Sequence, residues 1–379
     1  MKKLITLSKD TSIKVSSRIT SYLEPGYVYL PILSTDYENF RKQKIKKGAN
    51  LFSFRGKTVY SPVSGVIVGI KRLQEQDYLV IQNDFREEDQ YIGVSNQTTV
   101  ILKDNFAARI QKYADIHWEL FQGKKELILN GIEDEPYIAN KTFIHKYQTS
   151  EIFQVLDLLA DYFHIAKVTI CLKENDRESI EAIEEYLGTY PNFCLKILPD
   201  YYPLGNEEIL KRYIHLTEFC VVVSTEMISD MYLNVIRERK KDRILITVTG
   251  DAIKNPQVVE VKIGTPLADI KRLFQFKETE YCIFLNGLMK PTLCDGEENL
   301  ILTEEIRAIY FMKKKQVETR ECIRCGKCVE ICPMKCNPYY SFKTKGKYKN
   351  EKCLHCGLCT FICPSFIPLA TYLGEEKNE

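Results

Sequence analysis

The 379 residues exceed what one hydrophobic core commonly serves, so we expect two to four domains. With 45% hydrophobic and 27% charged residues the composition is that of an ordinary globular protein, and the net charge of +2 gives no support to nucleic-acid binding. No apolar run approaches the roughly 18 residues of a membrane-spanning helix, and residues 1–10 lack the apolar core of a secretory signal. We therefore expect a cytoplasmic protein whose membrane contact, if any, is made through a partner.

Residues 1–103 are rich in short alternating stretches and turns, which predict an N-terminal β domain with strands at 27–31, 66–70 and 78–82. The turn-centred units 45–51 and 61–67 resemble those of lipoyl and biotinyl carrier domains, whose cofactor is carried by a lysine at a hairpin tip. Because no such lysine-bearing tip occurs here, a scaffold domain is favoured over a carrier.

Residues 104–241 alternate between strand and helix patterns, which indicates a Rossmann-like α/β domain with a mainly parallel sheet. The predicted strands are 126–130, 168–172, 193–198 and 219–223, and the predicted helices are 150–163, 179–187, 207–214 and 226–238. In this part of the chain Cys171, Cys194 and Cys220 fall in apolar strand runs, as Cys282 does further on, and are predicted to be core residues. His117, His145, His164 and His215 show no metal-ligand spacing.

Residues 242–309 have the order strand, strand, helix, strand, at 244–249, 258–262, 266–274 and 281–285. This is the order of a ubiquitin-like β-grasp domain. A lysine-rich connection, residues 312–320, then leads into a cysteine-rich tail, so the fourth predicted domain covers residues 310–379. The locally basic runs 313–315 and 343–352 are favoured as solvated segments over a site for an anionic partner.

The tail repeats one cysteine spacing, Cys-x2-Cys-x2-Cys-x3-Cys-Pro, beginning at Cys322 and again at Cys353. This is the run of bacterial two-cluster ferredoxins, in which the fourth cysteine of each run ligates the other cluster. By that crossed rule one 4Fe–4S cluster is held by Cys322, Cys325, Cys328 and Cys363, and the other by Cys353, Cys356, Cys359 and Cys332.

Two alternatives for these cysteines are weaker. Zinc sites use Cys-x2-Cys pairs, but they do not need a third cysteine followed by Cys-Pro, twice over. A disulfide framework does not suit a large chain with nine cysteines crowded into one tail. Cys336 is the surplus thiol and receives no ligand role.

Taken together, the four segments resemble the C subunit of Rnf-type electron transport complexes. Outside the cysteines the resemblance is carried by the motifs at 130–137 (NGIEDEPY) and 247–256 (TVTGDAIKNP), and by 263–266 (IGTP). It implies a sandwich-hybrid N-terminal β domain, a flavin- and NADH-binding α/β domain similar to the flavoprotein subunit of respiratory complex I, a β-grasp domain of the soluble-ligand-binding (SLBB) type and a two-cluster ferredoxin domain. The fold class is accordingly multidomain α+β.

In that family the Asn-Gly-x-Glu-x-Glu-Pro-Tyr loop lies against the flavin, which makes Asn130, Glu133 and Glu135 the candidate flavin contacts; a simple strand-terminating loop is the equal alternative. The family's glycine-rich phosphate loop is not preserved, because residues 104–121 contain no glycine. The family's Tyr-Pro-x-Gly-Gly-Glu also becomes Tyr202-Pro-Leu-Gly-Asn-Glu207. We therefore expect the fold to be kept while FMN and NADH binding is lost or weakened.

Three functions compete. The first is an electron-transfer subunit that relays single electrons through two 4Fe–4S clusters between redox partners, among them the membrane subunits of an Rnf-like complex at the inner face of the cell membrane. The second is an intact FMN-dependent NADH-oxidising subunit, and the third is a docking protein with structural clusters. The missing glycine loop favours the first over the second, and two complete cysteine runs count against the third. Related soluble proteins serve amino-acid reductases or cobalamin reduction, and nothing in the chain separates those roles.

Overall fold

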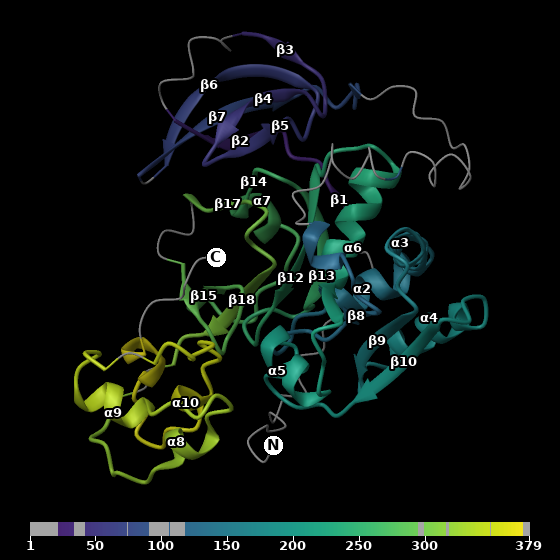
Figure 1. The fold of residues 1–379 in the computed structure, drawn as a ribbon. Helices are drawn as coiled ribbons and strands as arrows, with labels where there is room; N and C mark the ends of the chain where they lie inside the picture. The colour runs from purple at the N-terminus through teal and green to yellow at the C-terminus, as the bar shows by residue number, and fades with distance from the viewer. Residues whose placement is uncertain are drawn as a thin grey trace.

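The structure, a computed structural model, describes residues 22–33, 42–73, 75–90, 106, 118–294, 299–315, 318–348 and 350–373. These residues form a mixed α/β chain of several parts (Figure 1). An antiparallel β part lies at the top of the view, a parallel sheet with helices lies at the right, and a second large sheet occupies the centre. The cysteine-rich tail forms a separate lobe at the lower left.

The N-terminal β part is an antiparallel sheet in the order β2-β7-β6-β3, accompanied by a hairpin of β4 and β5. The strands are β2 (Tyr27–Ile32), β3 (Lys44–Ile45), β4 (Asn50–Phe54), β5 (Lys57–Tyr60), β6 (Gly65–Leu73) and β7 (Gln76–Asn83). The alternation predicted from the sequence is seen in β2, where Val28, Leu30 and Ile32 are at most 1% exposed while Tyr27 is 45% exposed. The three predicted strands are present with longer limits.

The parallel sheet has the order β10-β9-β8-β11. Its strands are β8 (Glu126–Asn130), β9 (Lys167–Lys173), β10 (Phe193–Leu198) and β11 (Cys220–Ser224); its helices are α3 (Thr149–Tyr162), α4 (Arg177–Leu187), α5 (Glu207–Tyr213) and α6 (Thr225–Met231). Strand order reverses between β8 and β11, so the carboxyl ends of these two strands form a topological switch point, where ligands bind in open α/β sheets. The predicted helix 226–238 is α6 followed by a π-helical turn, η3 (Tyr232–Ile236).

Helix α2 (Asn140–Tyr147) was not predicted, and it carries His145 into the interior, 0% exposed. His145 Nδ1 lies 2.9 Å from Ser179 Oγ, and Nε2 lies 2.8 Å from Thr225 Oγ1. Because the Ser179 hydroxyl donates its proton to Asp176, Nδ1 must be the donor of the imidazole and Nε2 the acceptor. One side chain thus ties together the first turns of α4 and α6.

Burial lowers the pKa of His145 to about 3, from an ordinary value of 6.5. As the pH falls below 6.5, the unfolded chain binds a proton at this histidine while the folded protein does not. The free energy of unfolding is therefore unaffected by this group above pH 6.5 and decreases as the pH falls from 6.5 toward 3. In nitrogen-15 NMR spectra of histidine-labelled protein, we expect the His145 ring to stay neutral and Nδ1-protonated from about pH 8 to 5. The variant His145→Gln assigns the signal, and a transition to imidazolium near pH 6.5 would contradict the buried geometry.

The central sheet has the order β1-β13-β12-β18-β15-β16. Its strands are β1 (Tyr22–Leu23), β12 (Arg243–Thr249), β13 (Gln257–Lys262), β15 (Tyr281–Leu285), β16 (Thr292–Leu293) and β18 (Ala308–Lys313); β14 (Thr265–Pro266), β17 (Ile301–Leu302) and helix α7 (Leu267–Lys271) lie beside it. Strands β12 and β18 are parallel and central, and Ile246, Val248 and Ile309 are fully buried on them. The expected domain boundary at 309/310 falls inside β18, and β1, from the region assigned to the first domain, pairs with β13.

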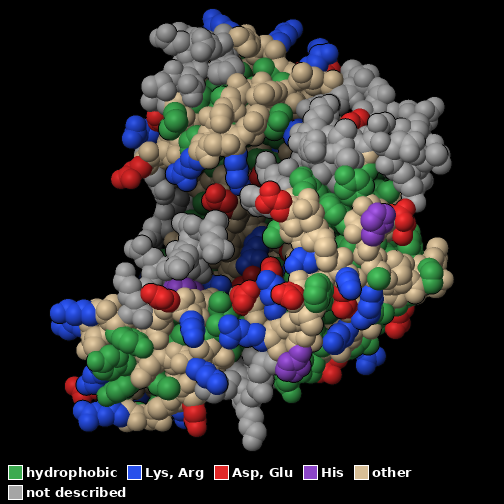
Figure 2. Space-filling view, in the orientation of Figure 1, with side chains coloured by type: hydrophobic (Ala, Val, Ile, Leu, Met, Phe, Trp, Pro, Cys, Tyr) green, Lys and Arg blue, Asp and Glu red, His purple; other side chains and the backbone are tan. Residues whose placement is uncertain are grey.

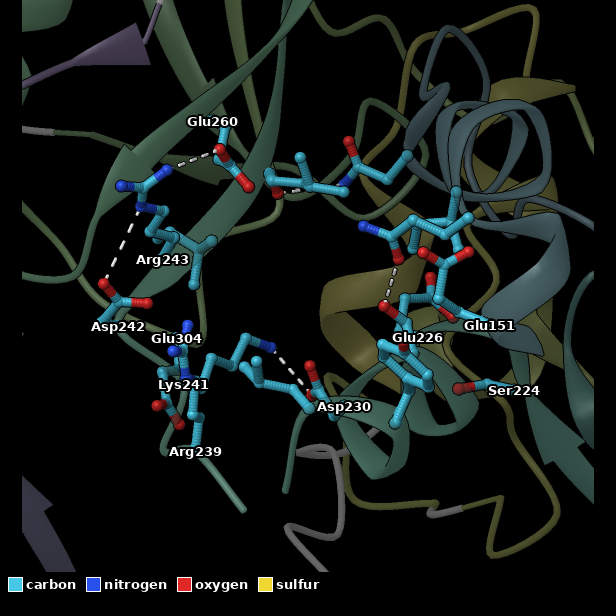
Figure 3. A pocket seen from close by; sticks show the side chains of 18 of the residues that line it. Glu151, Ser224, Glu226, Asp230, Arg239, Lys241, Asp242, Arg243, Glu260 and Glu304 are labelled. Carbon is cyan, nitrogen blue, oxygen red and sulfur yellow. Dashed lines mark hydrogen bonds and ion pairs between the residues drawn. The ribbon is translucent and has the colours of Figure 1, made fainter. Parts of the chain in front are cut away.

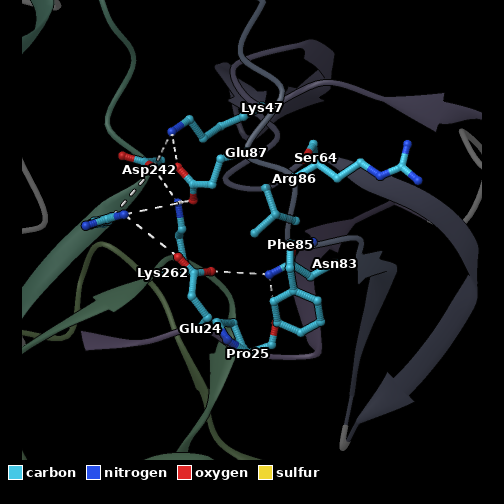
Figure 4. A network of polar contacts seen from close by, with 12 residues as sticks. Glu24, Pro25, Lys47, Ser64, Asn83, Phe85, Arg86, Glu87, Asp242 and Lys262 are labelled. Carbon is cyan, nitrogen blue, oxygen red and sulfur yellow. Dashed lines mark hydrogen bonds and ion pairs between the residues drawn. The ribbon is translucent and has the colours of Figure 1, made fainter. Parts of the chain in front are cut away.

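A buried lysine joins the N-terminal β part to the central sheet (Figure 4). Lys262, 0% exposed, donates from Nζ to Glu87 Oε1 and to Asp242 Oδ2, both at 2.7 Å. Lys47 also donates to Glu87, at 2.6 Å. Since Glu87 belongs to the first part and Lys262 to the central sheet, these ion pairs hold the two parts together.

The tail contains short helices separated by cysteine-bearing turns: α8 (Lys327–Ile331), α9 (Pro338–Lys343), α10 (Leu358–Phe361) and the 3-10 turn η5 (Leu369–Tyr372). None of the helices in the described ranges combines the length and apolar character that crossing a membrane demands. Of the cysteines predicted to be core residues, Cys171 is buried, whereas Cys194, Cys220 and Cys282 are only partly buried.

Candidate functional site

The eight cysteines of the two runs lie in the C-terminal lobe. Burial raises the pKa of Cys356 to about 11 and that of Cys359 to about 12, and burial also raises the pKa of Cys328. Cys332 and Cys353 pack against one apolar cluster, and Cys322, Cys328 and Cys363 pack against another, to which Cys353 and Cys359 also belong. The crossed division of the eight thiols into two ligand sets stays a prediction.

The local backbone suits thiolates that surround a cluster. Gly326 and Gly357, each directly after the second cysteine of a run, have φ of +75° and +73°, a left-handed conformation that glycine adopts without strain. The amide of Cys336 donates to Cys332 Sγ at 3.3 Å, and that of His355 donates to Cys353 Sγ at 3.4 Å. Hydrogen bonds of this kind stabilise cluster sulfurs and tune their potential.

The donor set fits two 4Fe–4S clusters, because each of two runs of identical spacing supplies four thiols. Among the described residues, no group of three or more His, Cys, Asp or Glu side chains is placed to hold one metal ion. Cys336 is buried beside Cys332 and packs in the core.

The second cysteine run contacts the α/β part and the central sheet. Tyr202 Oη donates to the carbonyl oxygen of Cys356 at 2.6 Å and approaches Glu135 Oε1 at 3.4 Å. Glu135 Oε2 in turn accepts from the amides of Leu288 at 3.1 Å and Met289 at 3.0 Å. A Cβ on Gly357 would overlap the carbonyl oxygen of Met289, so only glycine permits this contact. Glu135 and Tyr202 thus connect the α/β part, the central sheet and the tail.

The structure separates the three residues predicted to contact flavin. Asn130, at the carboxyl end of β8, lines the largest described pocket, whereas Glu133 and Glu135 line a smaller cavity of about 190 Å³. The Asn130 amide donates to Gly205 O at 2.9 Å, and its Oδ1 accepts from the Ile132 amide. Glu133 Oε1 accepts from the Lys141 amide at 2.5 Å, and burial raises the pKa of Glu133 to about 8. All three side chains bond to groups of the protein itself.

The largest described pocket, about 1580 Å³, opens at the switch point of the parallel sheet. It appears as the hollow at the centre of the space-filling view, with charged side chains around it (Figure 2). Glu226 and Ser224 of the α/β part face Arg243 and Asp242 of the central sheet across it, and Asp230 pairs with Lys241 at 2.8 Å (Figure 3). Lys47 and Glu87 of the N-terminal β part also line it, so three parts of the chain contribute to one charged cavity.

Two charged side chains at this pocket were not predicted, the buried Lys141 and the half-buried Asp134. Lys141 Nζ donates to the carbonyl oxygens of Ile132 at 2.9 Å and Asn130 at 3.3 Å. Asp134 Oδ2 accepts from Arg307 Nη2 at 2.6 Å, while its Oδ1 is buried with no hydrogen-bond partner among the described residues. Although burial opposes ionisation, Arg307 and Lys141 hold the pKa of Asp134 below its usual value. Lys141 was missed because α2 was missed; the acidic motif at 130–137 did contain Asp134. The glycine-free stretch 104–121 lies mostly outside the described residues.

Two family models match the chain. The Nuo51 FMN-binding domain matches residues 111–232, and the 4Fe–4S dicluster domain matches residues 321–367. Fold and cysteines together define a multidomain iron–sulfur protein with an α/β domain of flavoprotein type. A solved structure of an NAD+-reducing NiFe hydrogenase in the air-oxidised state is 15% identical, covers 67% of this chain and 55% of that chain, and has a TM-score of 0.47.

Curated relatives narrow this class. The C subunit of the ion-translocating oxidoreductase complex is 27% identical over 56% of this chain in Rhodobacter capsulatus and 30% identical over 68% in Haemophilus influenzae strain PittEE. The C subunit of the Na+-translocating ferredoxin:NAD+ oxidoreductase complex of Acetobacterium woodii is 27% identical over 56% of it. The matches cover 44%, 43% and 51% of those proteins, about half of their length or less. This chain is a relative of the C subunit of Rnf-type complexes.

Proposed function

We propose that this protein is an iron–sulfur electron-transfer subunit that relays single electrons between redox partners through two 4Fe–4S clusters. The observation that carries the proposal is the repeated Cys-x2-Cys-x2-Cys-x3-Cys-Pro run, which lies within residues 321–367, the segment matched by the 4Fe–4S dicluster domain. Each bound cluster would take up and release one electron at a time. The chain itself supplies the thiolates, the amides that bond to Cys332 and Cys353, and the apolar surroundings.

The partners follow from the relatives, which are subunits of ion-translocating complexes. We infer that this chain associates with other subunits of such a complex and sits peripherally on the cytoplasmic face of the membrane. The central sheet supports the assignment of a β-grasp domain of SLBB type, because the hairpin β12–β13, helix α7, and strands β15 and β18 follow in that order, with β12 and β18 parallel at the centre. The four-domain division, with a sandwich-hybrid domain first, belongs to the same proposal.

A degenerate flavin and NADH site is part of this proposal. Asn130, Glu133 and Glu135 bond to Gly205, to the Lys141 amide, and to the amides of Leu288 and Met289, so their polar groups are engaged within the protein. Residues 104–121 contain no glycine for a phosphate loop. Because these three side chains bond within the protein and the stretch lacks phosphate-loop glycines, tight flavin binding is not expected.

One observation favours a second function, FMN-dependent oxidation of NADH. The pocket of about 1580 Å³ at the switch point is large enough for a nucleotide cofactor, and Asp134 Oδ1 is buried beside it with no partner among the described residues. A donor on a bound cofactor would satisfy that oxygen. Asn130 and Asp134 would then contact the flavin, which would supply hydride acceptance and one-electron transfer to the clusters.

An anaerobic absorbance spectrum separates the two functions. We expect a broad cluster band without resolved flavin peaks, bleached by dithionite and unchanged by NADH. Flavin peaks that bleach on adding NADH would establish the second function instead. Absence of both the cluster band and bound iron, after anaerobic reconstitution with iron and sulfide, would overturn the electron-transfer proposal itself.

A further inference from the structure

The segment between the two cysteine runs has a packed side and an outward side. Residues 333–352 contain helix α9 and the turn that follows it, and none of the eight predicted ligand cysteines. Ser341 of this helix is 0% exposed, and the ring of Phe342 lies 5.3 Å from that of Tyr372. Helix α9 lies at the outer end of the lower-left lobe (Figure 1). The segment is therefore anchored to the tail on one side and turned away from the other parts of the chain on the other.

Hydrogen bonds hold the turn after α9 against the helix. Ser341 Oγ donates to Tyr348 O at 3.0 Å and accepts from Asn350 Nδ2 at 2.7 Å. The amide of Tyr348 donates to Thr344 Oγ1 at 3.2 Å. These bonds fold the chain back, so that Tyr348 comes to lie beside Tyr340.

The two tyrosines form one exposed aromatic surface. Their ring centroids are 5.0 Å apart and their planes are inclined at 75°, an edge-to-face contact. Tyr340 is 49% exposed and Tyr348 is 43% exposed. A tyrosine combines an apolar ring with a polar hydroxyl, which suits the boundary between lipid headgroups and hydrocarbon.

Lysines accompany the aromatic pair. Lys343 follows Tyr340 by three residues on α9, which places both on one side of the helix, and Lys345 and Lys347 belong to the turn; all three lysines are exposed. On this lobe, Lys and Arg side chains gather beside hydrophobic ones (Figure 2). The following residues are called the insert face below: Tyr340, Lys343, Lys345, Lys347 and Tyr348.

The charge of the chain is concentrated here. Residues 335–352 contain six Lys, one Glu and no Arg, a net charge of +5, whereas the whole chain carries +2. The remaining residues therefore carry a net charge of −3, so attraction to an anionic surface is directed to this segment. The sequence alone favours a solvated segment, and the structure adds the ordered turn and the exposed pair of rings.

The kind of cation distinguishes among anionic partners. Protein interfaces are enriched in Arg and depleted in Lys, and fixed carboxylates or phosphates are bound best by the planar guanidinium with two hydrogen bonds. Lysine is a flexible point charge whose apolar stem lies along apolar surface while its ammonium stays in water. A face of Lys and Tyr without Arg therefore suits headgroups that move freely in the plane of a bilayer and offer no fixed geometry.

We propose that the insert face contacts the surface of an anionic phospholipid bilayer, with its lysines against the headgroup phosphates and its two tyrosine rings at the interface. The inference rests on the peripheral location in the proposed function and assigns the surface of this chain that makes the contact. It is a binding step only, in which no bond or electron is transferred. The contact would keep the cysteine-rich lobe close to the membrane.

Binding is measured by co-sedimentation of the full, anaerobically reconstituted protein with phosphatidylcholine vesicles that contain either no phosphatidylglycerol or about 30% of it. The wild-type protein is expected to bind the anionic vesicles at about 50 mM salt, about tenfold more weakly at about 500 mM salt, and the neutral vesicles not measurably. The double variant Lys343→Gln with Lys345→Gln is expected to weaken binding about tenfold at the lower salt concentration. Tyr340→Ser is expected to weaken it about threefold, because it removes an interfacial ring.

The matched control is Lys44→Gln with Lys57→Gln, which removes the same charge from two exposed lysines of β3 and β5, in the part at the top of Figure 1. It is expected to change binding less than about twofold. Equal weakening by the control and by the insert-face lysine variant would show that net charge alone governs binding, and would overturn the insert face. A wild-type protein that does not prefer anionic to neutral vesicles would overturn it as well.

Other occupants are tested with the same variants, using single-stranded DNA and polyglutamate as probes. We expect neither probe to displace the wild-type protein from anionic vesicles. If one of them binds the wild type more tightly than the vesicles do, and binds Lys343→Gln with Lys345→Gln more weakly, the face serves nucleic acid or an acidic protein and the lipid proposal is overturned.

Iron content and the electron paramagnetic resonance spectrum of the dithionite-reduced protein are measured on every variant. Two clusters in all variants, with vesicle binding weakened only in the insert-face variants, support the proposal. Two clusters with vesicle binding unchanged in those variants overturn the insert face and leave the proposed electron-transfer function standing. Absence of clusters from the wild-type protein overturns the electron-transfer function, and the vesicle measurement then still decides the insert face.

Discussion

Replacing Cys332 by alanine is expected to abolish the cluster of the second run and to leave the cluster of the first run in place. Cys332 belongs to the first run in sequence, but the crossed rule assigns it to the cluster of the second run, and in the structure it packs against the same apolar cluster as Cys353. A cluster that loses one of four thiolates is poorly held, so iron should fall from about eight to about four ions per chain. Anaerobic iron analysis measures the loss.

The electron paramagnetic resonance spectrum of the dithionite-reduced variant then shows whether a single cluster remains. Two reduced clusters in one protein interact magnetically, and the variant should show the simpler signal of a single cluster. Cys363→Ala is the reciprocal variant, expected to remove the other cluster. The matched control is Cys336→Ala, a buried thiol beside Cys332 with no expected ligand role, which should retain both clusters. Loss of the first-run cluster on Cys332→Ala would show that the ligands are not crossed.

The elements that the sequence predicted well share a physical cause. Strand β8 (Glu126–Asn130) and strand β10 (Phe193–Leu198) were predicted to the residue, because each is a short, mostly apolar run bounded by turn residues. Helix α3 was displaced by one residue at each end, since its apolar residues recur at helical spacing. The cysteine runs were likewise recognised from local information, the spacing of the cysteines along the chain.

Other features depend on partners that are distant in sequence. Glu135 was predicted to touch flavin from its motif, and that contact stays a prediction. In the structure its carboxylate accepts from the amides of Leu288 and Met289, more than 150 residues away, which the motif does not indicate. Helix α2 was missed because several of its buried residues, including Asn140 and Lys141, are polar, so its sequence lacks the apolar periodicity that predicts a helix. Its Asn140 amide reaches the carbonyl oxygen of Arg307 at 2.8 Å, a contact between two parts of the chain. Local pattern cannot specify such contacts.

The second large effect is expected at the ion-pair network in Figure 4. The double variant Glu87→Gln with Asp242→Asn removes both carboxylates that bond the Lys262 ammonium, which is 0% exposed. A buried charge deprived of its counter-ions is costly, so we expect the free energy of unfolding to fall by about 3 kcal/mol or more. The first transition in urea unfolding, followed by circular dichroism, measures it.

Adding Lys262→Met to that double variant tests the cause. The triple variant removes the buried charge itself, and an apolar side chain of similar length should restore most of the lost stability. Glu260→Gln is the matched control on the same strand: Glu260 pairs with Arg243 at 3.2 Å, both about 30% exposed, and its loss should cost less than about 1 kcal/mol. If the triple variant is as unstable as the double variant, the carboxylates do not stabilise the fold by compensating the buried charge of Lys262.

The same network predicts a dependence on pH. Despite opposing burial, hydrogen bonds and charges from Lys262 and Lys47 lower the pKa of Glu87 to about 2, from 4.5. Because the folded-state pKa lies below the ordinary one, the stabilisation is complete above pH 4.5 and is lost as the pH falls toward 2. When the pH falls from 4.5 to 2, the free energy of unfolding of Glu87→Gln should decrease less than that of the wild type. If both proteins show the same slope of unfolding free energy against pH, Glu87 is not ionised against Lys262. The contacts that would then remain between the N-terminal β part and the central sheet include the ion pair of Lys47 with Asp242 at 3.7 Å and the hydrogen bond from the Tyr29 amide to Gly264 O at 2.9 Å.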